Sequence, residues 1–213
     1  MKEFLEKHVK WFSQGALKIV YGENVLYTDP FGIDAEYNDA DVILLTHPHF
    51  DHLSPEDIAK VIKEDTIFIV PASFSDLLDV YPTHQIVEVY PGDVLNLEYM
   101  ELSVVPAYNL VKTDCHPLEK GWVGYVMEFE EATLYYTSDT ELIPEMEDIE
   151  TDIIFLPMGQ TYTFECVEDA AKAALLTQAE VAVPIHYGKY EGTKEDVEKF
   201  KELLEGKVEV VVL

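Results

Sequence analysis

Three histidines and an aspartate lie within six consecutive positions of the segment Thr46–His52, which reads Thr-His-Pro-His-Phe-Asp-His. His47 and His49 are two residues apart, so in an extended backbone both rings point to the same side and can reach one metal ion. Asp51 and His52 follow after the chain has turned, and they offer an oxygen and a nitrogen to a neighbouring ion. This segment therefore predicts a loop that binds two metal ions.

An apolar run precedes this loop, and a helix signal follows it. Asp41–Leu45 is typical of a buried strand, and Ser54 followed by Pro55 is typical of a helix that begins with a capping residue and a proline in its first turn. We expect that helix over Ser54–Lys63. The end of a rigid strand is a suitable place for a metal site, because the strand determines where the side chains point.

The His-x-His-x-Asp-His pattern resembles the signature of the metallo-β-lactamase superfamily. This resemblance implies an α/β fold, a four-layer αβ/βα sandwich with two metal ions at one edge. Members add a metal-bridging aspartate after a later strand and a histidine near the end of the domain, which Asp139 and His186 match in order. Without the resemblance, Asp139 could equally be the N-cap of a helix over Glu141–Met146, and His186 an ordinary residue at a strand end.

The remaining imidazole ligand has two candidates, because the Gly-His pair that usually lies upstream of the bridging aspartate is absent. His116 lies 23 residues before Asp139, close to the separation that the superfamily keeps. Asn109 ends a Pro-Ala-Tyr-Asn phrase that resembles one branch of the superfamily. Imidazole binds divalent metals better than a neutral amide, so we favour His116. The neighbouring Cys115 is a possible soft ligand, but a bystander thiol is the simpler interpretation.

The resemblance to that branch covers most of the chain, and the matching phrases are Asp29-Pro30, Gly121–Tyr125, Pro144–Met146 and Thr161–Thr163. The branch is related to L-ascorbate 6-phosphate lactonase-like proteins, so the resemblance implies hydrolysis. Two departures stand out. Gln14-Gly15-Ala16 replaces a Gly-His-Ala, which removes a histidine near the substrate or behind a ligand. Ser138 replaces the glycine before Asp139, which requires only a tolerant backbone angle.

Charge limits the partners of this chain. It has 42 acidic residues and 14 basic ones, all of them lysine, so its formal net charge is −28. Nucleic acid is not an expected partner, because its recognition relies on clustered basic side chains. Without arginine, a phosphate on the substrate must be held by lysine, backbone N–H groups or metal. Lys112 and Lys189 are the lysines nearest the proposed ligands.

Length and composition indicate one domain over residues 1–213, since 213 residues that are 48% hydrophobic can bury a core of two packed sheets. No apolar run approaches the roughly 20 residues of a membrane span, and Met1–Lys10 lacks the apolar core of a signal peptide. Cys115 and Cys166 form no disulfide framework. We expect a soluble cytoplasmic protein with no membrane partner, which could form a homo-oligomer.

Periodicity places the other elements. Ala16–Tyr21 and Asn24–Asp29 read as a hairpin that brings Asp29 near the histidine-rich loop, where it could orient an imidazole or simply form an Asp-Pro turn. Further strands are expected at 66–70, 94–99, 102–105, 123–130, 133–137, 153–156, 181–185 and 208–213. Helices are expected at 74–80, 167–176 and 194–204.

These features predict a metal-dependent hydrolase that uses a metal-bridging hydroxide on a small ester, lactone or phosphorylated metabolite. Asp51 would be both a ligand and the proton acceptor, and Tyr162 or Tyr108 would steady the oxyanion. Two divalent ions are expected, zinc before manganese, iron or nickel. Two alternatives stay open: a redox di-iron protein, disfavoured because such relatives usually carry a flavodoxin partner, and a metal-binding member without turnover.

Overall fold

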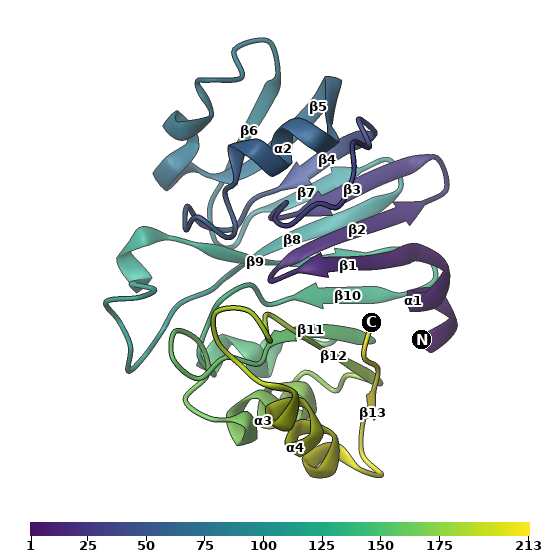
Figure 1. Ribbon diagram of the computed structural model, residues 1–213, viewed down its shortest axis with the longest axis vertical. Helices are drawn as coiled ribbons and strands as arrows, with labels where there is room; N and C mark the ends of the chain where they lie inside the picture. Colours follow the sequence, from purple (N-terminus) through teal and green to yellow (C-terminus); the bar gives the residue numbers. More distant parts are fainter.

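Two mixed β-sheets pack face to face in the computed structural model, which describes residues 1–213 (Figure 1). The first sheet contains, in spatial order, β1 (Val9–Ser13), β2 (Ala16–Tyr21), β3 (Asn24–Thr28), β4 (Ala40–Leu44), β5 (Ile62–Pro71) and β6 (Gln85–Val89). Strands β1 to β3 are antiparallel, and β3 to β6 are parallel.

The second sheet has seven strands with the same division. Its spatial order is β13 (Glu209–Val210), β12 (Val181–Ile185), β11 (Ile153–Pro157), β10 (Thr133–Tyr136), β9 (Val123–Glu128), β8 (Met100–Pro106) and β7 (Val94–Leu97). Strands β7 to β10 are antiparallel, and β10 to β13 are parallel. Strands β11 and β12 are buried along their whole length, as expected of parallel strands covered on both faces.

Helices lie at the two opposite outer sides of the sheets (Figure 1). Helix α2 (Pro55–Val61) packs on the first sheet, and α3 (Val167–Leu176) and α4 (Lys194–Leu204) pack on the second. The remaining helical segments are α1 (Lys2–His8) and the 3₁₀ turns η1 (Ala72–Leu78), η2 (Leu118–Lys120) and η3 (Pro144–Asp148). None of the helices combines the length and the apolar character that a membrane span requires.

Three apolar clusters separate four layers of structure. The largest, with 25 buried residues, lies between the two sheets and joins side chains such as Leu17 and Val42 to Tyr125 and Phe155. A second cluster of 20 residues lies under α3 and α4, and a third of 12 lies under α2. The predicted α/β four-layer sandwich is therefore confirmed.

Several predicted elements differ from the observed ones. The helix expected over Ser54–Lys63 ends at Val61, because Ile62 already belongs to the parallel strand β5. The helix expected at 74–80 is a 3₁₀ turn over Ala72–Leu78. The last strand is only Glu209–Val210, which pairs with Val181 and Ala182 of β12. Strands β1 and β6 and helix α1 were not predicted from the sequence.

Candidate metal centre

Four loops meet at one edge of the two sheets, and each follows a strand. They come after β4, β8, β10 and β12, and they carry the histidine-rich segment, His116, Asp139 and His186 respectively. The carboxyl ends of parallel strands lie at one edge of a sheet, so β10 and β12 deliver their loops together. The loop after β4, in the other sheet, meets them there, because His47 and His52 lie 3.9 Å and 3.4 Å from the Asp139 carboxylate. No helix begins at Asp139, because the next helical turn is η3 at Pro144–Asp148. The N-cap interpretation of Asp139 is therefore wrong.

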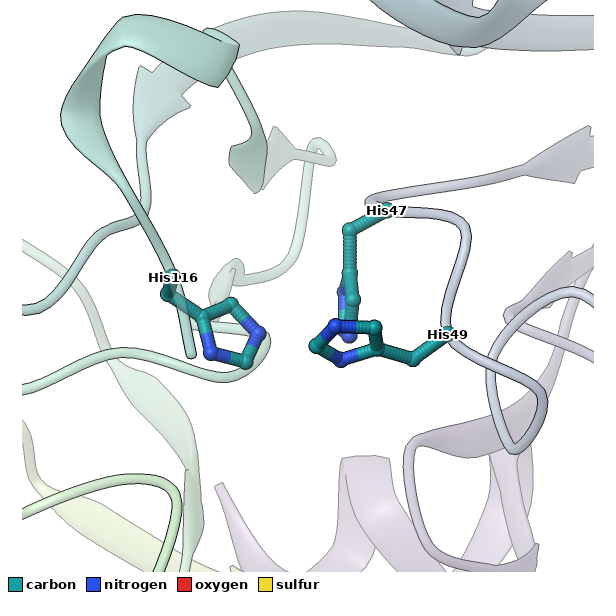
Figure 2. A group of neighbouring side chains, drawn as sticks. All are labelled: His47, His49 and His116. Atoms are coloured by element: carbon teal, nitrogen blue, oxygen red, sulfur yellow. The ribbon is translucent and has the colours of Figure 1, made fainter. Parts of the chain in front are cut away.

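Three imidazoles form the first group of potential ligands. His47, His49 and His116 each offer a nitrogen that lies within 4.8 Å of the others. Figure 2 shows His47 and His49 on one loop and His116 on the loop opposite, with the three rings pointing toward one another. Ring centroids are 4.6 Å apart between His47 and His49 and 4.7 Å apart between His47 and His116. This arrangement presents three nitrogens to a common point.

A second group lies beside the first. Asp51, His52 and His186 place one ligand atom each within 4.8 Å of the others. The Nε2 atom of His186 is 3.5 Å from the Asp51 carboxylate and 3.3 Å from Nε2 of His52. This group offers one oxygen and two nitrogens, all from buried residues.

The Asp139 carboxylate lies between the two groups. Its Oδ2 atom is 3.9 Å from Nε2 of His47 and of His116, and 3.4 Å from Nε2 of His52 and of His186. One oxygen thus faces two imidazoles of each group. That is the position from which a carboxylate can bridge two ions.

The donor atoms of the first group fit a metal ion. Nε2 of His47 and both ring nitrogens of His116 are buried and have no hydrogen-bond partner within the protein. Buried polar atoms are almost always paired, so three unpaired nitrogens on two neighbouring rings need an explanation. Burial, together with the neighbouring imidazoles, holds the pKa of His47 well below 6.5, and burial lowers the pKa of His116 to about 4. Both rings are therefore neutral near pH 7, as a metal ligand must be.

The second group is held by carboxylates. Burial disfavours charge on His186 and His52, but Asp139 and the other adjacent carboxylates outweigh it, raising the pKa of His186 to about 9 and that of His52 well above 6.5. Burial would raise the pKa of Asp139, yet His186 and His52 hold it well below 3.8. This concentration of negative charge around two imidazoles is suited to a divalent cation, which would take the place of their protons.

Asp29 orients His52 from behind. Its Oδ2 atom accepts hydrogen bonds from Nδ1 of His52 at 2.8 Å, from the Thr46 hydroxyl at 2.6 Å and from the Tyr136 hydroxyl at 2.7 Å. Its Oδ1 accepts from the Thr46 backbone N–H. With Nδ1 engaged, the Nε2 atom of His52 faces the second group. The predicted contact between Asp29 and an imidazole of the loop is confirmed, and it is the arrangement that tunes ligands in metalloproteins.

The residues that depart from the family pattern, Gln14, Gly15 and Ser138, lie beside these candidate ligands. A Cβ on Gly15 would be 2.0 Å from the Tyr136 oxygen, so the Tyr136 hydroxyl occupies the space that a side chain at position 15 would need. Gln14 and Ser138 stand where the pattern has glycine, and both keep a left-handed backbone, with φ of 48° and 58°. The Gln14 amide donates to Asp51, and the Ser138 hydroxyl lies 3.4 Å from Nδ1 of His47.

Glu191 is a site residue that sequence reasoning missed. Its Oε1 atom lies 3.3 Å from Nδ1 of His186, on the side of the ring away from Asp139. Its Oε2 atom accepts from the backbone N–H groups of Thr161 and Tyr162. Glu191 follows the last ligand by five residues in a loop without periodic pattern, so only the fold reveals its role in orienting His186.

A cavity of about 380 Å³ opens beside the two groups, lined by His49, Asp51, Asp139 and His186 on its inner side. Tyr162 and Cys115 line it as well, but Cys115 belongs to neither group of potential ligands. Tyr108 does not line the cavity, and its hydroxyl donates to Glu145. The Asn109 amide donates to the Lys112 and Tyr162 carbonyls, and its backbone N–H binds the His116 carbonyl. Asn109 thus supports the loop of His116.

The four-layer fold, with potential ligands clustered at the edge of its sheets, is that of a known protein family. The model of the family described as "Beta-lactamase superfamily domain" matches residues 20–187, so this chain belongs to that family.

Individual relatives agree with the family. A UPF0173 metal-dependent hydrolase of Methanopyrus kandleri is 30% identical, with 96% of each chain covered. A crystal structure from Parabacteroides distasonis, described as that of a metal-dependent hydrolase, is 33% identical with a TM-score of 0.84, covering 96% of this chain and 91% of that one. CmlA, a di-iron β-hydroxylase of Streptomyces venezuelae, is 13% identical with a TM-score of 0.77, covering 97% of this chain and 52% of that one. At that identity the likeness shows the fold alone.

Proposed function

We propose that this chain is a metal-dependent hydrolase that holds two divalent ions, zinc being best suited to its nitrogen and oxygen donors. His47, His49 and His116 would hold one ion, and Asp51, His52 and His186 the other. The observation that carries the proposal is the position of Asp139, whose Oδ2 faces two imidazoles of each group at 3.4–3.9 Å. The names of the relatives support hydrolysis as the reaction.

Bound ions of this kind lower the pKa of a water toward about 7 and polarise the oxygen of the bond that breaks. The protein contributes the rest. Asp51 lies at the cavity wall with one oxygen held by Gln14, and it is the group that we assign to accept the proton of the attacking water. Tyr162 lines the same cavity, and we assign its hydroxyl to donate to the developing oxyanion. Small esters, lactones and phosphorylated metabolites are the substrates that this chemistry would admit.

Hydrolysis of a small panel of substrates tests the proposal. Protein loaded with zinc, manganese or iron is assayed on a carboxylic ester, a lactone and a phosphodiester. We expect hydrolysis of at least one class, and we expect His49→Ala to abolish it, because the variant removes a nitrogen of the first group. His84→Ala is the matched control, since His84 binds the Lys63 carbonyl far from the groups of ligands.

Full metal occupancy without turnover on any class would contradict the proposal and would favour a metal-binding protein that does not catalyse. A protein that binds only iron and absorbs visible light would favour the redox alternative. Tyr162→Phe distinguishes a role in catalysis from one in packing. We expect a fall in kcat with little change in KM, whereas Tyr90→Phe, at an exposed position elsewhere, should change neither.

A further inference from the structure

Large aromatic rings surround the mouth of the cavity and are exposed to solvent. Phe50 is 65% exposed, and Tyr162 and Tyr190 are each 48% exposed, although all three line the same cavity as the candidate ligands. Exposed rings that gather at one place mark a binding site more often than rings scattered singly. This concentration of apolar surface beside the reactive groups therefore bears on what the cavity binds.

Two of these rings, Phe50 and Tyr190, contact each other and also the partly buried Phe31 beside them, and we call Phe31, Phe50 and Tyr190 the aromatic wall. The centroids of Phe50 and Tyr190 are 5.2 Å apart with the rings edge to face, and Phe31 lies 6.1 Å from Phe50 and 6.2 Å from Tyr190. The three residues come from three different loops, and their mutual contacts limit how far each ring can move. The wall is thus a formed apolar surface.

The lysines nearest the candidate ligands in sequence hold their charge outside the cavity lining. No lysine lines the cavity. The Lys112 ammonium donates to the Gln160 and Phe164 carbonyls, both at 3.1 Å, and pairs with Glu165 at 3.1 Å. The Lys189 ammonium lies over the Phe31 ring, 4.4 Å from its centroid. It is also 5.5 Å from the centroid of Tyr190. Lys112 is therefore engaged by protein oxygens, and Lys189, which is exposed and outside the cavity lining, covers the faces of aromatic rings.

Backbone donors near the cavity are engaged as well. The buried Glu141 carboxylate accepts hydrogen bonds from three consecutive backbone N–H groups, those of residues 110, 111 and 112, at 2.7–3.0 Å. Successive backbone N–H groups of this kind form the usual cradle for a phosphate. Glu191 accepts from the next such pair, Thr161 and Tyr162. The protein's own carboxylates thus fill the places where an anion could bind.

We propose that the substrate is a neutral carboxylic ester or lactone that carries an aromatic or bulky apolar group, and that this group packs against the aromatic wall. The inference rests on the proposed hydrolase function. In the reaction, the water oxygen bonds to the carbonyl carbon, the acyl C–O bond breaks, and the leaving oxygen takes a proton. An ester gives an alcohol and a carboxylic acid, a lactone gives a single hydroxy acid, and the acid then ionises. A phosphorylated metabolite is disfavoured, because no lysine lines the cavity and the successive backbone N–H groups of residues 110–112 and 161–162 already bind carboxylates.

Three methyl esters test this proposal on the zinc-loaded protein, with proton release as the signal. Methyl 3-phenylpropanoate carries the apolar group, methyl acetate lacks it, and monomethyl succinate replaces it with a charge. Burial of a phenyl ring predicts a kcat/KM for the phenyl ester at least about tenfold above that of methyl acetate. The succinate ester should be the poorest substrate. Tyr190→Ala should reduce the preference for the phenyl ester several-fold, whereas the matched Tyr90→Ala should leave it unchanged.

The outcomes separate this inference from the function on which it rests. Hydrolysis of all three esters without a preference, or a preference for the succinate ester, would overturn the inference and leave the hydrolase intact. For a readout that needs no turnover, calorimetry compares 3-phenylpropanamide with acetamide. Binding of the phenyl amide alone, weakened by Tyr190→Ala, would support the apolar subsite even if no ester is hydrolysed. Equal or absent binding of both amides would count against it.

Discussion

Adding one methyl group at Gly15 should disrupt the network behind the second group of ligands. A Cβ at this position would lie 2.0 Å from the Tyr136 oxygen, and contacts under 3.0 Å are not sustained in real proteins. In Gly15→Ala the Tyr136 hydroxyl must therefore move, and it would lose its 2.7 Å hydrogen bond to Asp29. Asp29 orients His52, so the effect should extend to metal binding.

The expected magnitude combines two effects. Overpacking in a core destabilises by about 1–3 kcal/mol, and loss of a hydrogen bond to a charged group by about 1.5–3 kcal/mol. We expect Gly15→Ala to lower the free energy of unfolding by about 3 kcal/mol or more, which is roughly 6 °C or more in Tm for a chain of this size. Loss of an outer contact to a ligand should also weaken metal affinity by about 10- to 100-fold.

A double-mutant cycle isolates the clash. In a Tyr136→Phe background the oxygen and its hydrogen bond are already gone. There, Gly15→Ala should cost only about 1 kcal/mol, which leaves a coupling of about 2 kcal/mol between the two positions. Urea unfolding measures all four proteins. Gly22→Ala is a reference without a clash, because a Cβ there meets nothing within 4 Å; its cost is that of a left-handed backbone, which Gly15 does not have. Strictly additive effects, or a harmless Gly15→Ala, would refute the assignment of this space to Tyr136.

Three further predictions concern the candidate ligands and the groups beside them. Glu191→Gln should weaken metal binding by about 10- to 100-fold in a competition with a chelator, because its carboxylate lies 3.3 Å from His186; Glu195→Gln, which is exposed, should not. In chelator-treated protein the free energy of unfolding should fall between about pH 6.5 and pH 4, since burial lowers the pKa of His116 to about 4 and only the unfolded chain then takes up its proton. Denaturation midpoints measured across this range check the prediction, and a fall of the same size in His116→Gln would contradict it. Cys115→Ser should keep the metal content of the wild type in elemental analysis, because Cys115 belongs to neither group; a loss of metal would assign the thiol as a ligand.

The strands that carry the site were predictable from the sequence. The apolar runs at 181–185 and 153–156 are almost the observed β12 and β11, because fully buried parallel strands leave a continuous apolar signal. The resemblance to the family directed attention to Asp139 and His186 as partners of the histidine-rich loop. Residues separated by up to 139 positions in the chain thus lie together at one sheet edge.

The residues that surround the ligands were not predictable in the same way. The Gln14 amide contacts His186, 172 residues away, through a backbone in the left-handed region that propensity disfavours for glutamine. Glu191 reaches His186 because Gly188 and Gly192, both with positive φ, turn the loop back. In the sequence, Tyr136 is one residue of an alternating strand pattern. Only the fold shows that its hydroxyl donates a hydrogen bond to Asp29. Such contacts depend on tertiary packing, which leaves no periodic signal in a loop.

Helix α1 and strand β6 were not predicted from the sequence for a related reason. Helix α1 has seven residues, of which Phe4, Leu5 and His8 are buried, and a helix this short is stabilised by packing and not by its own propensity. Strand β6 lies at the edge of its sheet and buries only Val89 fully. Neither element contributes a side chain to the candidate metal centre, so the prediction of the site did not depend on them.

Metal stoichiometry tests the central claim most directly. Protein purified without chelator and supplied with zinc is analysed for bound metal per chain, in the wild type and in Asp139→Asn. Because the Asp139 oxygen faces both groups of ligands, we predict two ions in the wild type and fewer than two in the variant. His84→Ala should retain two. A wild type without bound metal, or an Asp139→Asn variant that retains two ions as tightly as the wild type, would contradict the account.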